Sequence, residues 1–364
     1  MKLTIVAGAR PNFMKIAPLI HEIQKQQALG IGISYRLVHT GQHYDANLSD
    51  TFFNELNIPP PHTNLEVKSG TQAQQTGAIM MGFEAELKQH PCDMVIVVGD
   101  VTSTMACTIV AKKAHIEVAH VEAGIRSGDL NMPEEINRMV TDSITDVFFT
   151  TSQTATDFLK NSGVTNERIH FVGNVMIDTL LGNLDRLHPP SFWEELQLSP
   201  QQYYVLTLHR PSNVDGIDGF KALLQRIVTN AKGAPIIFPV HPRTQKILDD
   251  AQLSFENLHT VSPQGYLSFI YLVKNAKAIL TDSGGITEEA SILNIPCLTF
   301  RNSTERPETC ELGTNLLVGT QLDAIDDAFE RLEGGNWPQA QDIPKWDGKA
   351  SKRIIDALLK HHEH

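Results

Sequence analysis

Residues 281–289 read Thr281-Asp282-Ser283-Gly284-Gly285-Ile286-Thr287-Glu288-Glu289 and directly follow the apolar run 278–280. A strand that ends in small residues and opens into a helix is typical of α/β proteins, and the helix N-terminus offers unpaired N–H groups to an anion. The two glycines let the backbone approach such a ligand closely. The pattern places Glu288 and Glu289 in the first helical turn. Acids there suggest a ligand with hydroxyls as well as phosphate, such as a nucleotide or a nucleotide-sugar.

Composition limits the class of protein. A chain of 364 residues predicts two domains, and its net charge of −12 argues against a nucleic-acid partner. The four cysteines lack CxxC spacing, which predicts reduced thiols instead of a disulfide or metal site. Residues 1–8 are typical of a first strand and not of a signal peptide, and no apolar run approaches the roughly 20 residues of a membrane span. We therefore expect a cytoplasmic protein with no membrane contact.

Apolar segments typical of buried strands alternate with segments of helical spacing along most of the chain. The expected strands are residues 2–7, 35–39, 94–98, 117–121, 147–150, 169–172, 204–208, 235–240, 258–261, 278–280 and 297–300. Such alternation implies right-handed βαβ units and parallel sheets. The two sets are separated near the proline-rich residues 188–191, so we expect two Rossmann-like domains that face a cleft, at 1–172 and 173–350. From the pattern alone, the last helix belongs to either domain.

Polar residues concentrate where the expected strands end. In open α/β sheets, ligands bind at the carboxyl ends of the strands. A single charged residue there is as often a helix cap or a solvated side chain, but several at equivalent positions favour a binding site. Seven charged or imidazole residues have such positions: Arg10, Lys15, Asp100, Glu122, Arg126, His209 and Arg210.

A helix expected from Pro133 carries Glu134 and Arg138 on one face, because they are four residues apart. The simplest interpretation is a surface ion pair. The preceding loop contains two glycines and a proline, however, and it could bring Glu134 toward Asp100 and Glu122. Three gathered carboxylates would raise one another's pKa values by repulsion and would suit acid–base chemistry.

Several familiar motifs are missing from the sequence. There is no GxGxxG dinucleotide fingerprint, no P-loop and no paired-acid DxD motif of metal-dependent sugar transferases. His39 and His43 are four apart, but Gly41 between them predicts a loop and not a zinc-binding helix. We expect no cofactor and no metal.

A set of segments occurs in order across nearly the whole chain: Gly8-Ala9-Arg10-Pro11-Asn12-Phe13-Met14-Lys15, Gly99-Asp100, His120-Val121-Glu122-Ala123-Gly124-Ile125-Arg126, Pro133-Glu134-Glu135-Ile136-Asn137-Arg138, His209-Arg210, residues 281–289 and Thr304-Glu305-Arg306-Pro307-Glu308. Together they resemble the UDP-N-acetylglucosamine 2-epimerase family. The resemblance implies a glycosyltransferase-B-like fold and a homodimer. It also implies that the C-terminal helix, within 351–364, crosses back to the N-terminal domain.

The resemblance also implies a reaction and its residues. Members of the family epimerise C2 of a UDP-N-acetylhexosamine, UDP-GlcNAc to UDP-ManNAc, by eliminating UDP to a glycal and adding it back. The implied catalytic residues are Asp100, Glu122, Glu134, Arg138 and His209. The implied substrate- and UDP-binding residues are Arg10, Lys15, Ser283, Gly284, Gly285, Glu289 and Arg306, with the Ser-Gly-Gly turn at the phosphates and Glu289 at the ribose.

Other functions remain open at this stage. The Gly8-Ala9-Arg10-Pro11 start and the segment Gly41-Gln42-His43-Tyr44-Asp45 resemble enzymes that act on UDP-2,3-diacetamido-glucuronate, which is the first alternative substrate. A hydrolysing 2-epimerase is a second alternative. A glycosyltransferase of similar fold is a third, against which the three carboxylates and the absence of an evident acceptor-binding region argue.

Overall fold

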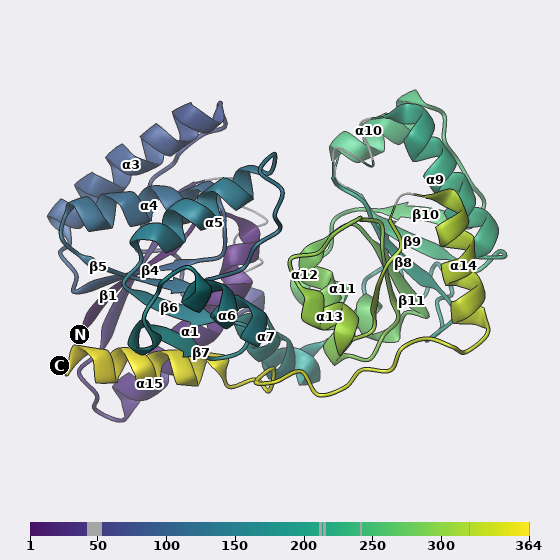
Figure 1. Ribbon diagram of the computed structural model, residues 1–364. Helices are drawn as coiled ribbons and strands as arrows, with labels where there is room; N and C mark the ends of the chain where they lie inside the picture. The colour runs from purple at the N-terminus through teal and green to yellow at the C-terminus, as the bar shows by residue number, and fades with distance from the viewer. Residues whose placement is uncertain (42–52, 211–212, 214–215, 241, 320, 364) are drawn as a thin grey trace. The chain divides into compact units, whose positions relative to one another are not determined.

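The computed structural model describes residues 1–41, 53–210, 213, 216–240, 242–319 and 321–363. The chain forms two compact units, one of Met1–Gly182 with Pro344–His364 and the other of Asn183–Ile343. Each unit is a parallel β-sheet whose strands alternate with helices (Figure 1). The predicted α/β class with two Rossmann-like domains is confirmed.

The first unit has the strand order β3-β2-β1-β4-β5-β6-β7. Its strands are β1 (Lys2–Ala7), β2 (Ser34–His39), β3 (Thr63–Asn64), β4 (Met94–Val98), β5 (Glu117–Val121), β6 (Val147–Thr150) and β7 (Ile169–Phe171). Its helices are α1 (Arg10–Ala28), α3 (Gln72–Gln89), α4 (Thr102–Lys113), α5 (Pro133–Ile144), α6 (Gln153–Asn161), α7 (Val175–Asn183) and α15 (Ala350–His362). The strand order reverses between β1 and β4, which is where open α/β sheets bind ligands.

The second unit has the strand order β10-β9-β8-β11-β12-β13, which reverses between β8 and β11. Its strands are β8 (Tyr204–Thr207), β9 (Ile236–Pro239), β10 (Leu258–Val261), β11 (Ala278–Thr281), β12 (Cys297–Thr299) and β13 (Asn315–Leu317). Its helices are α9 (Ile217–Asn230), α10 (Pro242–Asp250), α11 (Tyr266–Asn275), α12 (Gly284–Ile292), α13 (Pro307–Glu311) and α14 (Leu322–Glu333).

All the strands predicted from apolar runs are present, each within one residue at either end. They are apolar throughout because helices cover both faces of a parallel sheet, as in β4, where all five residues are buried. The short strands β3 and β13 were not predicted. Both lie at a sheet edge and contain only two and three residues, too few for a pattern.

The sequence pattern predicts domain boundaries after residue 172 and before residue 351. In the structure, the chain passes from one unit to the other between Gly182 and Asn183 and returns between Ile343 and Pro344. Helix α7 therefore lies in the first unit, where its Asp178 accepts hydrogen bonds from the backbone N–H groups of Ala350 (3.0 Å) and Ser351 (2.7 Å). Asp178 thus caps the N-terminus of α15, which packs against α1 (Figure 1). The last helix belongs to the first unit.

Two predictions from composition can be compared with the structure. The four cysteines are free thiols, with Cys107 and Cys297 buried. Among the residues that the structure describes, no helix is both long and apolar enough to cross a membrane.

Candidate functional site

A buried ion pair lies at the carboxyl end of β5. Glu122 follows this strand with a φ of +72°, a left-handed backbone that is uncommon outside glycine. The N–H groups of Glu122 and Ala123 both donate to the carbonyl of Phe149 at 3.0 Å, which holds this conformation. Lys15 of α1 donates its Nζ to Glu122 Oε2 at 2.6 Å, and the Glu122 side chain is only 2% exposed. A strained backbone that carries a buried charge is characteristic of functional sites.

Gly99 and Asp100 lie beside this pair. A Cβ on Gly99, whose φ is +71°, would stand 3.3 Å from Lys15 Nζ and 3.6 Å from Glu122 Oε2. Asp100 Oδ2 accepts hydrogen bonds from Arg138 Nη2 (2.5 Å) and Nε (3.1 Å). The carboxyl ends of β4 and β5 therefore bring together four of the predicted site residues.

Helix α5 supplies Arg138 and also two acids in its first turn, where the helix dipole favours negative charge. Glu134 is half-buried there. Its neighbour Glu135 is buried and accepts from the N–H groups of Ser127 (2.9 Å) and Gly128 (3.0 Å) and from Arg138 Nη1 (2.7 Å). Burial raises the pKa of Glu135, but these hydrogen bonds outweigh it and leave the pKa lowered. Glu135, which has no role in the sequence-based prediction, fixes both the loop and Arg138.

Two of the three predicted carboxylates each contact a cation. The sequence suggests three carboxylates that repel one another, but the structure gives Asp100 and Glu122 each a cation, Arg138 and Lys15. The ion pairs fix where the carboxylate oxygens of these two residues lie.

A buried network joins the loops that carry the two carboxylates. His120 of β5 places Nδ1 2.7 Å from Asp142 Oδ1 and donates Nε2–H to the carbonyl of Gly99 at 2.8 Å. Asp142 Oδ2 accepts from the N–H of Gly124 (3.1 Å) and from Arg126 Nη1 (2.7 Å). Burial raises the pKa of Asp142, but the contacts with His120 and Arg126 lower it more, so the net pKa is below its usual value. Arg126, predicted near a ligand, pairs with this internal carboxylate.

In the second unit, β11 leads through Ser283 into α12. The helix begins at Gly284, so the amide groups of its first turn have no partner within the helix and can receive an anion. The prediction that Glu288 and Glu289 lie in this first turn was wrong. The Ser-Gly-Gly residues already occupy the start of the helix, and the two acids lie in its second turn, buried.

The two acids have different partners. Glu288 forms an ion pair with Arg306, whose side chain is only 11% exposed. Glu289 Oε1 accepts the hydroxyl of Tyr266 at 3.0 Å. Burial raises the pKa of Glu289 to about 8, against a lowering effect of the Tyr266 hydrogen bond and with a further increase from the charge of Glu288. The Glu289 carboxyl is therefore mostly protonated at neutral pH.

His209 follows β8 and is held by Asp282, the residue after β11. Its Nδ1 lies 2.8 Å from Asp282 Oδ1. Asp282 is fully buried and also accepts the N–H groups of His209 (3.0 Å) and Arg210 (2.9 Å) and the amide of Asn213 (3.0 Å). Asp282 was part of the decisive sequence stretch but was not predicted as a site residue. Its position directly after a strand was the signal that could have identified it.

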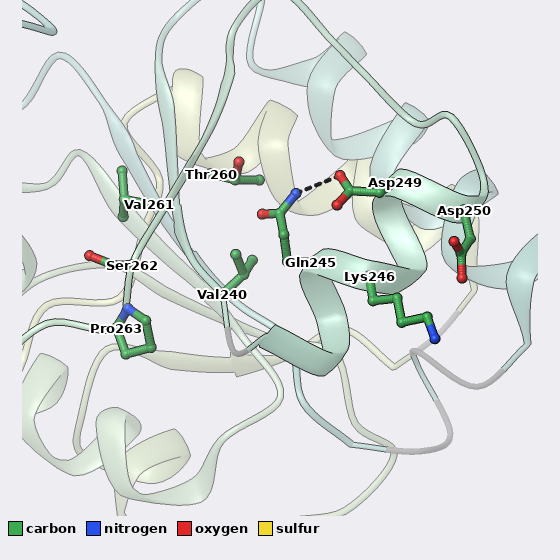
Figure 2. A pocket seen from close by; sticks show the side chains of 9 residues that line it. All are labelled: Val240, Gln245, Lys246, Asp249, Asp250, Thr260, Val261, Ser262 and Pro263. Atoms are coloured by element: carbon green, nitrogen blue, oxygen red, sulfur yellow. Dashed lines mark hydrogen bonds between the residues drawn. The ribbon is translucent and has the colours of Figure 1, made fainter. Parts of the chain in front are cut away.

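A cavity of about 490 Å³ lies beside the carboxyl ends of β9 and β10, away from the reversal between β8 and β11 (Figure 2). Figure 2 shows Gln245 of α10 turned toward Asp249, to which its Nε2 donates at 2.8 Å. Asp249 and Asp250 of α10 would repel a diphosphate in this cavity. It is lined by Val240, Gln245, Lys246, Asp249, Asp250, Thr260, Val261, Ser262 and Pro263.

The predicted residues therefore gather in two groups, one in each unit. Lys15, Asp100, Glu122 and Arg138 lie together in the first unit, with Glu134 at the start of α5. His209, Ser283, Gly284, Gly285, Glu289 and Arg306 lie at the β8 and β11 edge and on the elements that follow it in the second. Arg10 is the first residue of α1. Residues 42–45, on which the alternative substrate partly rests, and with them His43, are outside the described residues.

Comparison with known proteins agrees with this architecture. A family model described as UDP-N-acetylglucosamine 2-epimerase matches residues 23–359. The chain is 40% identical to UDP-N-acetylglucosamine 2-epimerase of Methanocaldococcus jannaschii, over 98% of this chain and 99% of that protein. It is 38% identical to UDP-2,3-diacetamido-2,3-dideoxy-D-glucuronate 2-epimerase of Pseudomonas aeruginosa, over 99% of this chain and all of that protein. The crystal structure of the M. jannaschii enzyme in complex with UDP-GlcNAc and UDP matches with a TM-score of 0.88 and 40% identity, over 99% of this chain and all of that one. The chain belongs to the UDP-N-acetylglucosamine 2-epimerase family.

Proposed function

We propose that this protein is an isomerase that reversibly inverts C2 of a UDP-N-acetylhexosamine, converting UDP-GlcNAc to UDP-ManNAc. The observation that carries the proposal is the buried Lys15–Glu122 pair beside Asp100, in a chain of the 2-epimerase family. An epimerase must move a proton at carbon, and carboxylates held in fixed positions are suited to that task. Family membership supplies the substrate class.

The proposed reaction has two halves. One carboxylate takes the C2 proton while the C1–O bond breaks, so that UDP leaves with the bonding electrons and a C1=C2 double bond forms. A proton then returns to the opposite face of C2 as a UDP oxygen adds back to C1. Asp100, Glu122 and Glu134 are the proposed acid–base groups. Arg138 positions Asp100 and Lys15 positions Glu122, through the ion pairs described above.

The second unit is proposed to bind UDP. The amide groups of Gly284 and Gly285, which begin α12, would receive the diphosphate together with Ser283. Glu289, protonated at neutral pH, can both donate to and accept from ribose hydroxyls. Arg306 of the second unit and Arg10 of the first are the other proposed substrate-binding residues. His209 is proposed as a catalytic residue, together with the acid–base groups and Arg138.

The direct test is to incubate the protein with UDP-GlcNAc in deuterated water. We expect deuterium at C2 of both epimers, because the lost proton exchanges with solvent. Glu122→Gln should lower turnover by at least about 100-fold and leave the Kd of UDP nearly unchanged. Glu84→Gln makes the same change at an exposed position of α3 and should be as active as the wild type. No exchange with any UDP-N-acetylhexosamine would reject the proposal, and accumulation of free sugar and UDP would indicate a hydrolysing enzyme.

Similarity to a second relative supports an alternative substrate, a UDP-2,3-diacetamido-glucuronate. The P. aeruginosa relative acts, by its name, on UDP-2,3-diacetamido-2,3-dideoxy-D-glucuronate and is nearly as similar to this chain as the M. jannaschii relative. Both sugars bear an N-acetyl group at C2, so the same chemistry serves both. Comparing kcat/KM for the two substrates decides between them.

We infer that the protein works as a homodimer. Met81 of α3 is 70% exposed, and Met139 and Ile136 of α5 are 45% and 43% exposed. Helices α3 and α5 both contact α4, and large apolar side chains left exposed often mark protein interfaces. Light scattering should give twice the mass of 40.4 kDa, and Met81→Glu with Met139→Glu should give the monomer.

Four free thiols favour a reducing compartment, so a cytoplasmic location is part of the proposal.

A further inference from the structure

We propose that Asp282 is a positioning residue for epimerisation, which holds the His209 ring so that Nε2 faces the nucleotide-sugar. The inference rests on the proposed function, which includes His209 in the catalytic set. It adds a residue with a defined task, to fix the tautomer and the orientation of an exposed imidazole.

The strand ends that carry the two residues are fixed to each other. Strands β8 and β11 are parallel neighbours, with Thr207 paired to Thr281 in the ladder. The hydroxyls of these two threonines are also hydrogen-bonded, at 2.6 Å. The next residue after Thr281 is Asp282, and His209 is two residues after Thr207. The pair therefore lies at the point where the strand order reverses, which is where this kind of sheet binds its ligand.

The contacts of the Asp282 carboxylate divide into two kinds. Three of them tie down the chain after β8: the N–H groups of His209 and Arg210 and the side-chain amide of Asn213. The fourth is the contact of Oδ1 with the ring nitrogen Nδ1 of His209, at 2.8 Å. In an Asp282→Asn variant, the amide oxygen could still accept most of the hydrogen bonds from the chain after β8. The contact with the His209 ring, in contrast, depends on the carboxylate.

The ring contact determines where the imidazole carries its proton. An ionised carboxylate can only accept, so Nδ1 carries the hydrogen. Nε2, on the opposite side of the ring, is then a lone-pair acceptor when the ring is neutral and a donor when the ring is charged. Burial raises the pKa of Asp282, but the hydrogen bonds and the charge of His209 lower it more, which keeps the carboxylate ionised.

Exposure explains why a positioning residue is needed. The His209 side chain is 63% exposed, whereas that of Asp282 is 0% exposed. An exposed ring held by no partner would sample several rotamers and both tautomers. The buried carboxylate removes that freedom before the substrate binds, which lowers the entropy cost of reaching the reactive geometry.

The experiment combines nitrogen NMR of the wild type with a double-mutant cycle. In ¹⁵N-histidine-labelled, ligand-free protein, the neutral His209 ring should carry its hydrogen on Nδ1. Asp282→Asn should lower kcat at least about 10-fold, shift the ring toward a mixture of tautomers and change the Kd of UDP by less than about 3-fold. Asp282→Asn should cost little further in a His209→Asn background, because it acts through the ring. Asp326→Asn, the same change at an ion pair with Arg226 elsewhere in this unit, should leave kcat unchanged.

The outcomes separate this inference from the proposed function. A neutral ring with its hydrogen on Nε2 would overturn the inference without any variant, even where Asp282→Asn does not fold. Equal kcat for wild type and Asp282→Asn would overturn it too, as would full additivity with His209→Asn. Wild-type protein that exchanges no deuterium at C2 would reject the proposed function, whatever the NMR result.

Discussion

Replacing Glu289 with glutamine should make the protein more stable, and the gain should grow with pH. The pKa of Glu289 is raised from 4.5 to about 8, chiefly by burial. Between these two values the folded state holds a proton that the unfolded state has released, so the stability of the wild type falls as the pH rises. Each pH unit in this window costs roughly 1.4 kcal/mol, which gives an upper bound of about 5 kcal/mol by pH 8. A glutamine side chain at this position has no proton to lose, and it keeps an oxygen that can accept the Tyr266 hydroxyl.

The assay is urea unfolding of ligand-free protein at intervals from pH 5 to pH 8.5. We expect the wild type and Glu289→Gln to differ little at pH 5, and the variant to be more stable by a few kcal/mol at pH 8.5. Glu195→Gln makes the same change at an exposed position of the second unit and should follow the wild type at every pH. A difference between wild type and Glu289→Gln that stays constant with pH would show that Glu289 is ionised throughout and would refute the reasoning.

Three further changes test the supports of the site. Asp142→Asn should destabilise the fold by about 3–5 kcal/mol at pH 7. Because the pKa of Asp142 is lowered in the folded state, the difference from wild type in urea unfolding should shrink below pH 3.8. A difference that stays constant with pH would contradict the stabilising role of the Asp142 charge. Asp178→Ala removes the cap of α15 and should cost about 1–2 kcal/mol, with faster hydrogen exchange at residues 350–353; unchanged exchange would argue against the cap. Gly173→Ala places a Cβ 2.0 Å from the carbonyl oxygen of Lys345 and should lower the Tm strongly. Gly163→Ala should lower it far less, because φ is also positive there but no atom lies within 4 Å of the new Cβ. Equal losses of Tm would show that the cost comes from the backbone conformation alone and not from the steric contact.

Local patterns were sufficient to predict the sheets. A parallel strand covered on both faces is a continuous apolar run, and β4 shows it in five consecutive residues. Edge strands such as β3 lack this signal because they are short and half-buried. The end of the first unit was also beyond local pattern, since α7 is assigned to that unit by a contact between Asp178 and residues more than 170 positions later.

The site was predictable in its residue types and not in its pairings. Residues one or two positions after a strand, such as Glu122 and His209, stand out because all strand ends of a parallel sheet meet at one edge. Which cation meets which carboxylate depends on register and on backbone conformation, for instance the left-handed Glu122 that faces Lys15. Asp282 was missed for a related reason: its partners come from the neighbouring strand, about 70 residues away in sequence.

The pairings explain how a chain of net charge −12 can hold an anionic substrate. The overall field disfavours a nucleoside diphosphate, and acids close to the proposed phosphate seat would add to this repulsion. In the second unit those acids are compensated, Glu288 by the guanidinium of Arg306 and Glu289 by the proton that burial retains. Asp282 keeps its charge, but it is fully buried and shares its oxygens among donors from His209, Arg210 and Asn213. The N-terminal amides of α12 therefore lie at an edge where these acids are paired, protonated or hydrogen-bonded, so local compensation can offset the unfavourable net charge of the chain.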